Sequence, residues 1–123
     1  MVTGYVDDIR PFIQKAAVCI APLISGAGLR TKVVQYAALR RPSVVTPIAA
    51  EDLLFETDRE LCVADGADSF ARQVIALLRD PALAATIAER AYERAVREYD
   101  NVNIAEHGLN TLYRLLDQPR EQP

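Results

Sequence analysis

The chain contains little cysteine and little histidine. Its 123 residues include two cysteines and a single histidine, His107. Cys19 and Cys62 each lie inside an apolar run, far apart in sequence and without a CxxC spacing, so we expect small buried side chains. His107 has no second histidine with which to share a metal. The sequence therefore predicts no metal site, no disulfide, no cysteine or histidine catalysis and no cofactor.

A long apolar segment is also lacking. No apolar run approaches the ~20 residues that span a bilayer. The first eight residues, MVTGYVDD, have neither the basic start nor the long apolar core of a signal peptide. We therefore expect a cytoplasmic protein without a transmembrane segment. Its length and its 50% hydrophobic content predict one domain over residues 1–117, followed by a disordered tail over residues 118–123.

The chain lacks the basic excess of nucleic-acid-binding proteins, because its formal net charge is −3. The charges are unevenly distributed. Residues 9–50 contain six cations and no carboxylate, whereas fifteen acids and eight arginines follow from Glu51 onward. This asymmetry favours a small phosphorylated ligand over a nucleic acid. The alternative, that the acid-free window reflects chance and a buried sheet, stays open.

Apolar runs alternate with helical patterns along the chain. The sequence predicts four strands, over residues 2–6, 17–22, 43–46 and 61–64. Helices are expected over residues 9–16, 32–40, 69–78, 81–99 and from 103 onward, with one further helical turn over 51–55. Their expected caps are Asp7 and Asp8 for the first helix and Asp68, Asp80 and Asn103 for the last three. This order is typical of an α/β fold, a Rossmann-like parallel sheet of about four strands flanked by helices, with a helical C-terminal part.

The helical patterns also predict which side chains pack inward. The expected apolar faces are Val33, Val34, Ala37 and Ala38 in one helix, Phe70, Val74, Leu77 and Leu78 in a second, and Leu109, Leu112, Leu115 and Leu116 in the last.

A glycine-rich turn joins the second predicted strand to the helix that follows it. Gly26 and Gly28 allow the backbone to approach a ligand closely, and the first N–H groups of the helix point at the same place. Arg30 and Lys32 add two positive charges there. Ligands of open parallel sheets bind outside the carboxyl ends of the strands, where this turn falls. The pattern predicts an anion-binding site, and an ordinary strand-to-helix loop with solvated cations remains the alternative.

Several segments resemble a known family in their order and spacing. They are GYVDD at 4–8, APL at 21–23, GAGLRTKVVQYA at 26–37, RPSVVT at 41–46, AEDL at 50–53 and LLRDP at 77–81. Together they resemble the C-terminal, nucleotide-sugar-binding half of GT-B glycosyltransferases of the group 1 (family 4) type. The resemblance covers nearly the whole chain.

The resemblance implies that the domain binds a nucleoside-diphosphate sugar, as in enzymes that transfer the sugar with retention of configuration. Gly26 and Gly28 would give backbone approach to the diphosphate, and Arg30 and Lys32 would supply its countercharge. Gln35 lies where the family usually has a glutamate that accepts hydrogen bonds from the ribose. Residues 4–6, which are Gly4, Tyr5 and Val6, would lie near the nucleotide base.

Departures from the family pattern bear on activity. Gln35 has no charge, and the family's other glutamate falls near Ser25 or Ala27, where this chain has no carboxylate. Arg40 and Arg41 stand where the family commonly has a glycine. The family's preceding strand–helix units and its acceptor-binding N-terminal domain have no counterpart here. We therefore expect a partial domain that is inactive alone, and that either joins such a domain or self-associates through exposed apolar surface.

Two other interpretations remain open. The chain is a degenerate, non-catalytic homologue that acts as a protein-interaction subunit, or it is a phosphate-binding regulatory α/β domain unrelated to glycosyl transfer. Asp7 and Asp8 resemble the acidic sites of such regulatory domains, although helix capping also explains them.

Overall fold

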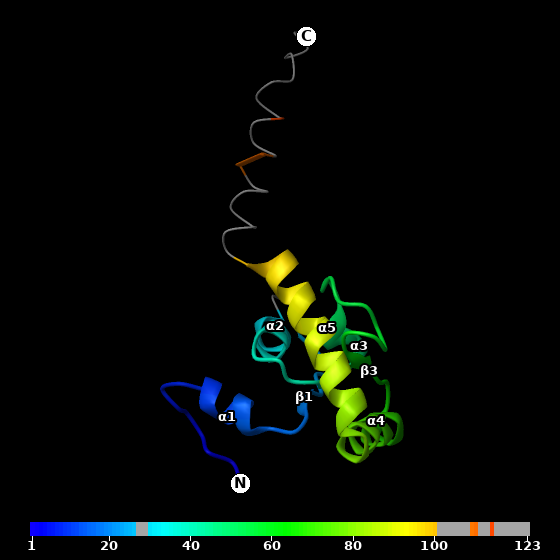
Figure 1. Cartoon of the computed structure of the whole chain (residues 1–123). Helices are drawn as coiled ribbons and strands as arrows, with labels where there is room; N and C mark the ends of the chain where they lie inside the picture. Colours follow the sequence, from blue (N-terminus) through cyan, green and yellow to red (C-terminus); the bar gives the residue numbers. More distant parts are fainter. Residues whose placement is uncertain (27–29, 101–108, 111–113, 115–123) are drawn as a thin grey trace.

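The computed structural model describes residues 1–26, 30–100, 109–110 and 114 (Figure 1). Within them, β1 (Cys19–Ala21), β2 (Ser43–Val45) and β3 (Cys62–Val63) form a parallel sheet in the order β1-β2-β3. Ile20 lies opposite Val44, and Val44 lies opposite Cys62. The α/β class and the parallel sheet expected from the sequence are confirmed, with three strands in the described part of the chain.

Helices cover both faces of the sheet, as buried parallel strands require. Successive side chains of β2 point to opposite faces. Val44 packs in one cluster with Leu77 of α4 (Ala67–Arg79) and Ile87 of α5 (Pro81–Tyr99). Val45 packs in another with Val33 of α2 (Thr31–Ala38) and Ala49 of α3 (Pro47–Ala50).

Helix α5 packs against α4 on one side of the sheet and against α2 on the other. Its first half packs with α4 through Ala84 and Ile87, whereas Ala91 and Ala95 in its second half pack against Ala37 of α2. Figure 1 shows α5 crossing in front of the sheet from α4 toward α2. The small alanine side chains allow the two helices to approach each other closely.

Local signals position the helix ends. Asp80 Oδ1 accepts a hydrogen bond from the Leu83 N–H at 3.0 Å, which confirms it as the cap of α5. Asp8 Oδ1 accepts from the Arg10 N–H at 3.0 Å, at the start of α1 (Arg10–Lys15). In contrast, Asp68 lies inside the first turn of α4, whose cap position is Gly66.

The C-terminal end of α2 is a Schellman motif, a helix end closed by two specific backbone hydrogen bonds. The Arg40 N–H donates to the Ala37 carbonyl and the Arg41 N–H donates to the Tyr36 carbonyl. Arg40 occupies the left-handed position of the motif with φ of 53°. Glycine is the usual residue there, and Arg40 stands where the family pattern has one.

Two expected elements are wrong. Residues 2–6 form no strand, because a strand requires a pairing neighbour and they have none among the described residues; Val2 and Tyr5 are 97% and 92% exposed. The helical turn expected over 51–55 lies at α3 instead, because Pro47 starts it and Asp52, with φ of 61°, takes the chain out of helical geometry. The last expected helix lies mostly outside the described residues, although residues 109–110 and 114 are helical.

The expected apolar faces are confirmed in part. Val33, Ala37 and Leu77 are buried, and Phe70 and Val74 pack against the core. Leu78 is 54% exposed and Ala38 is exposed too, so these two predictions are wrong. Ile20 of β1 is also 47% exposed, because α4 packs over β2 and β3 and leaves this face of β1 uncovered.

Candidate functional site

The candidate site lies at the carboxyl edge of the sheet, where the segments after β1, β2 and β3 meet. They enclose a pocket of about 780 Å³, whose apolar wall includes Leu23, Ile24, Ile48 and Phe70. Asp65, which follows β3, also lines the pocket. Sequence reasoning placed ligand binding at this edge but did not predict the pocket.

Hydrogen bonds tie the segments after β1 and β2 to each other. The Thr46 N–H donates to the Ala21 carbonyl at 3.2 Å, and the Thr46 hydroxyl donates to the Leu23 carbonyl. These bonds satisfy backbone carbonyls of the β1 segment without a further strand. The two segments therefore form one surface rather than two independent loops.

Arg30 adds a longer connection between the same segments. Its Nε lies 3.0 Å from the Ile48 carbonyl oxygen, and its Nη2 lies 3.2 Å from the Gly26 carbonyl oxygen. The side chain therefore spans from the glycine turn to α3. Sequence reasoning named Arg30 as a ligand of a diphosphate and did not foresee these contacts with the protein's own backbone.

Lys32 and Gln35 lie on the first two turns of α2. Both are exposed, and their spacing of three residues places them on one face of the helix. No acidic residue lies in the first turn of α2. A cation and an amide thus stand next to the N–H groups that open the helix, and this arrangement can accept an anion joined to a hydroxyl-bearing group.

The other residues predicted for the site belong to the glycine turn and to the N-terminal segment. Gly26 precedes the turn with φ of 135°, a conformation that L side chains rarely adopt. Gly28 lies outside the described residues. Gly4, Tyr5 and Val6 belong to the N-terminal segment before α1 (Figure 1), and Tyr5 is 92% exposed. The structure brings Gly26, Arg30, Lys32 and Gln35 into one unit, and the role expected for residues 4–6 stays a prediction.

Reactive side chains of other kinds fit structural roles. Burial raises the pKa of the Cys19 thiol and that of the Cys62 thiol, so both disfavour the thiolate form that reacts. Within the described ranges, no cluster of His, Cys, Asp and Glu could hold a metal ion. The described helices also include none with the length and apolar character needed to cross a bilayer.

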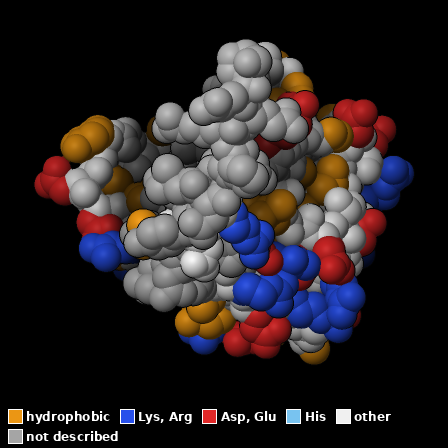
Figure 2. Space-filling model, turned by 90° about the horizontal axis from the view of Figure 1, so that it is seen from above, with side chains coloured by type: hydrophobic (Ala, Val, Ile, Leu, Met, Phe, Trp, Pro, Cys, Tyr) orange, Lys and Arg blue, Asp and Glu red, His pale blue; other side chains and the backbone are white. Residues whose placement is uncertain are grey.

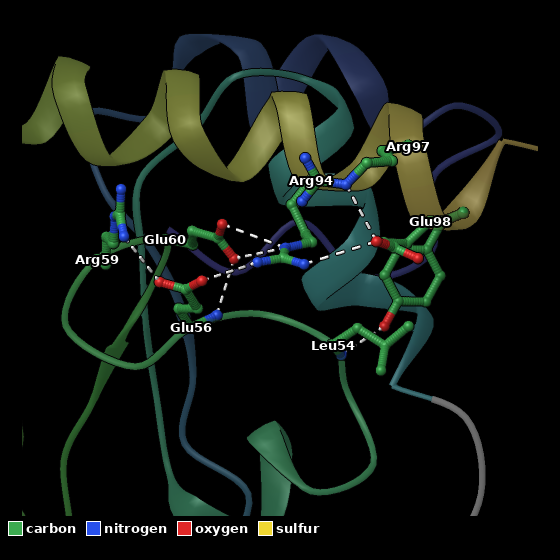
Figure 3. Close-up of polar contacts among 8 residues, drawn as sticks. Leu54, Glu56, Arg59, Glu60, Arg94, Arg97 and Glu98 are labelled. Atoms are coloured by element: carbon green, nitrogen blue, oxygen red, sulfur yellow. Dashed lines mark hydrogen bonds and ion pairs between the residues drawn. The ribbon is translucent and has the colours of Figure 1, made fainter.

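A second charged cluster, which the sequence analysis missed, joins the segment before β3 to α5. Arg94 points from α5 toward this segment (Figure 3), where its Nε lies 3.0 Å from Glu60 Oε2 and its Nη2 lies 3.0 Å from Glu56 Oε1. Glu60 is only 7% exposed and also accepts from the Glu56 N–H at 2.8 Å. The Tyr99 hydroxyl accepts from the Leu54 N–H at 2.8 Å.

This cluster is a structural connection, because each buried charge in it has a partner of opposite sign. Figure 2 shows that basic and acidic side chains lie interleaved on this side of the molecule. The spacing of Glu56 and Glu60 ahead of β3 was the available sequence signal, but it does not say which arginine they meet.

Fold and site together define an α/β domain in which α2, with Lys32 and Gln35 exposed on its first turns, follows the carboxyl edge of a parallel sheet. The family described as "Glycosyl transferases group 1" matches residues 1–80 of the chain, which include the sheet, the glycine turn and α2. The chain belongs to this group 1 glycosyltransferase family. No curated protein gives a significant match to the chain.

Proposed function

We propose that the domain binds the nucleoside-diphosphate part of a sugar donor. The observation that carries this proposal is the position of Lys32 and the first N–H groups of α2, directly after the glycine turn and at the carboxyl edge of the sheet. Gly26 gives the backbone close approach, Lys32 supplies countercharge, and Gln35 accepts or donates a hydrogen bond to the ribose. Family membership supports a nucleotide-sugar donor as the ligand.

The chemistry of sugar transfer requires such a site. Breaking the bond between the sugar and the diphosphate sends negative charge onto the departing phosphate oxygens. Helix N-terminal amides and a fixed cation stabilise that charge more strongly in the transition state than in the bound donor. The proposal includes transfer with retention of the configuration of the sugar, as the family resemblance implies.

We expect the chain alone to bind a donor without transferring its sugar. Position 35 carries an amide, and residues 22–30 contain no carboxylate, so the pair of glutamates expected from the family resemblance is absent from the sequence. An amide still bonds a hydroxyl group, so this departure affects catalysis more than binding.

Calorimetric titration tests the proposal. The chain is titrated with the diphosphates of uridine, guanosine and adenosine, then with the same nucleotides joined to glucose, and the matching nucleosides serve as controls. We expect saturable binding of at least one diphosphate and none of its nucleoside. Equal binding of nucleoside and diphosphate would contradict a site built on Lys32 and α2.

One observation favours a second candidate, a non-catalytic homologue that acts as an interaction subunit. Ile20 of β1 and Leu78 of α4 leave apolar side chains in water on the same side of the sheet, and position 35 carries no charge. In that case no nucleotide would bind, and sedimentation over a concentration series would show self-association. A monomer at every concentration that binds a diphosphate would exclude this candidate.

A further inference from the structure

The Arg30 side chain forms hydrogen bonds with the protein's own backbone. Nε donates to the Ile48 carbonyl and Nη2 donates to the Gly26 carbonyl, so two donors of the guanidinium hold two segments that are eighteen and four residues away in sequence. The Ile48 carbonyl also accepts from the Glu51 N–H at 3.3 Å, at the end of α3. Arg30 therefore holds the end of this short helix against the glycine turn.

The position of Ile48 matters for the candidate site. Ile48 and its neighbour Pro47 form part of the wall of the 780 Å³ pocket, together with Leu23 and Ile24 from the β1 segment. Helix α3 has only four residues, so its own hydrogen bonds hold it weakly. A connection from Arg30 limits how far this wall moves relative to Gly26.

We infer that Arg30 is a positioning residue, which shapes the donor site by joining the glycine turn to α3, and that Lys32 is the residue whose charge meets the diphosphate. This inference rests on the proposed function and corrects the division of roles that the sequence suggests. Guanidinium suits the task because its planar fork directs several N–H groups in fixed directions, whereas a lysine ammonium is a single compact charge.

The two roles predict different behaviour for a conservative variant. If Arg30 contributes charge to a phosphate, Arg30→Lys keeps most of the affinity. If it joins two carbonyls on separate segments, Arg30→Lys behaves like Arg30→Ala, because one ammonium does not reproduce the fork. Lys32→Ala removes charge from the site and leaves the connection intact.

Hydrogen exchange of the ligand-free chain, followed by mass spectrometry, tests the connection directly. We expect Arg30→Ala and Arg30→Lys to speed amide exchange around residues 24–34 and 48–51 by about tenfold, which corresponds to one lost hydrogen-bonded connection. Exchange in α5 stays slower than in either of these segments, which shows that the fold is intact. Lys32→Ala and the arginine control Arg10→Ala leave exchange in both segments unchanged.

Titration with the diphosphate that the wild type binds best completes the test. We expect Arg30→Ala and Arg30→Lys to weaken its binding equally, by about tenfold, and to keep the wild-type salt dependence. Lys32→Ala weakens binding and reduces the salt dependence. Unchanged exchange in the two Arg30 variants, or affinity retained in Arg30→Lys alone, overturns the inference. If the wild type binds none of the diphosphates, the proposed function fails, and the exchange comparison still decides whether Arg30 joins the segments.

Discussion

The Tyr36 hydroxyl lies 3.1 Å from the Ile20 carbonyl oxygen and donates a hydrogen bond to it. Tyr36 belongs to α2, and Ile20 is the central residue of β1, which lies at one edge of the sheet. The Cys19 N–H donates to the Pro42 carbonyl and the Ala21 carbonyl accepts from the Thr46 N–H, so these two residues direct their backbone groups toward β2 and the Ile20 carbonyl between them points to the open edge. The Tyr36 hydroxyl thus satisfies a carbonyl group that another strand could otherwise use as a hydrogen-bond acceptor.

The variant Tyr36→Phe tests this protection. We expect it to lower the free energy of unfolding by about 0.5–1.5 kcal/mol, because the carbonyl loses its partner but stays close to water. Self-association in sedimentation experiments increases as the edge becomes available. Tyr5→Phe, on a side chain that is 92% exposed, is the control. No change in either measurement would mean that water replaces the tyrosine without cost.

Lys32→Ala tests the proposed countercharge. We expect the affinity for a nucleoside diphosphate to fall by about 1.5–3 kcal/mol, the value of a hydrogen bond to a charged group. Thermal stability hardly changes, because Lys32 is exposed. Lys15→Ala removes the same charge from α1 and leaves binding as it is. Wild-type affinity in Lys32→Ala would remove this residue from the site.

Gln35→Glu restores the carboxylate that the family resemblance leads us to expect. A carboxylate accepts two hydrogen bonds from ribose hydroxyls and needs no donor in return, so we expect nucleotide affinity to be kept or raised. Gln14→Glu adds the same charge to α1 and controls for net charge. Weaker binding with an intact fold would indicate that α2 is oriented differently from the family's helix.

Arg40→Gly and Arg40→Ala separate backbone strain from side-chain contacts. Both variants lose the contact of the guanidinium with the Tyr92 ring, 3.5 Å from its centroid, and the ion pair with Glu89. Only glycine relieves the positive φ of this position. We expect Arg40→Gly to be more stable than Arg40→Ala by about 1 kcal/mol in urea unfolding. Equal stability would show that the helix end relaxes to another conformation.

Glu60→Ala removes the buried acceptor of the Arg94 cluster. The Glu56 N–H loses its partner, and Arg94 loses its hydrogen bonds with Glu60. We expect unfolding to become easier by about 1–3 kcal/mol in denaturant titration. Glu93→Ala, on an exposed part of α5, should stay within about 0.5 kcal/mol of the wild type. A similar loss in both variants would mean that net charge, and not this cluster, matters.

Features encoded within a few neighbouring residues were predictable from the sequence. The apolar runs that became β1, β2 and β3 and the cap at Asp80 each depend on local pattern or on one side chain near its own backbone. The face shared by Lys32 and Gln35 was predictable for the same reason. Residues 2–6 have the composition of a strand, but pairing needs a partner that composition does not specify.

Contacts between distant segments were not predictable. Glu60 and Arg94 are 34 residues apart, and nothing in either segment identifies the other as its partner. Arg30 has the charge of a phosphate ligand, and only its geometry against Ile48 and Gly26 reveals another use. Charge is visible in a sequence, whereas the group that meets it depends on the packing of the whole domain.

The path of α5 across both helix layers has a consequence for how the domain unfolds. Ala84 and Ile87 close the cluster around Val44, and Ala91 and Ala95 close the contact with α2. Separation of α5 would therefore expose both layers at once. Because α5 takes part in a buried contact of each layer, we expect the two layers to lose their structure in one cooperative transition, with amide exchange in α5 reporting the global free energy of unfolding.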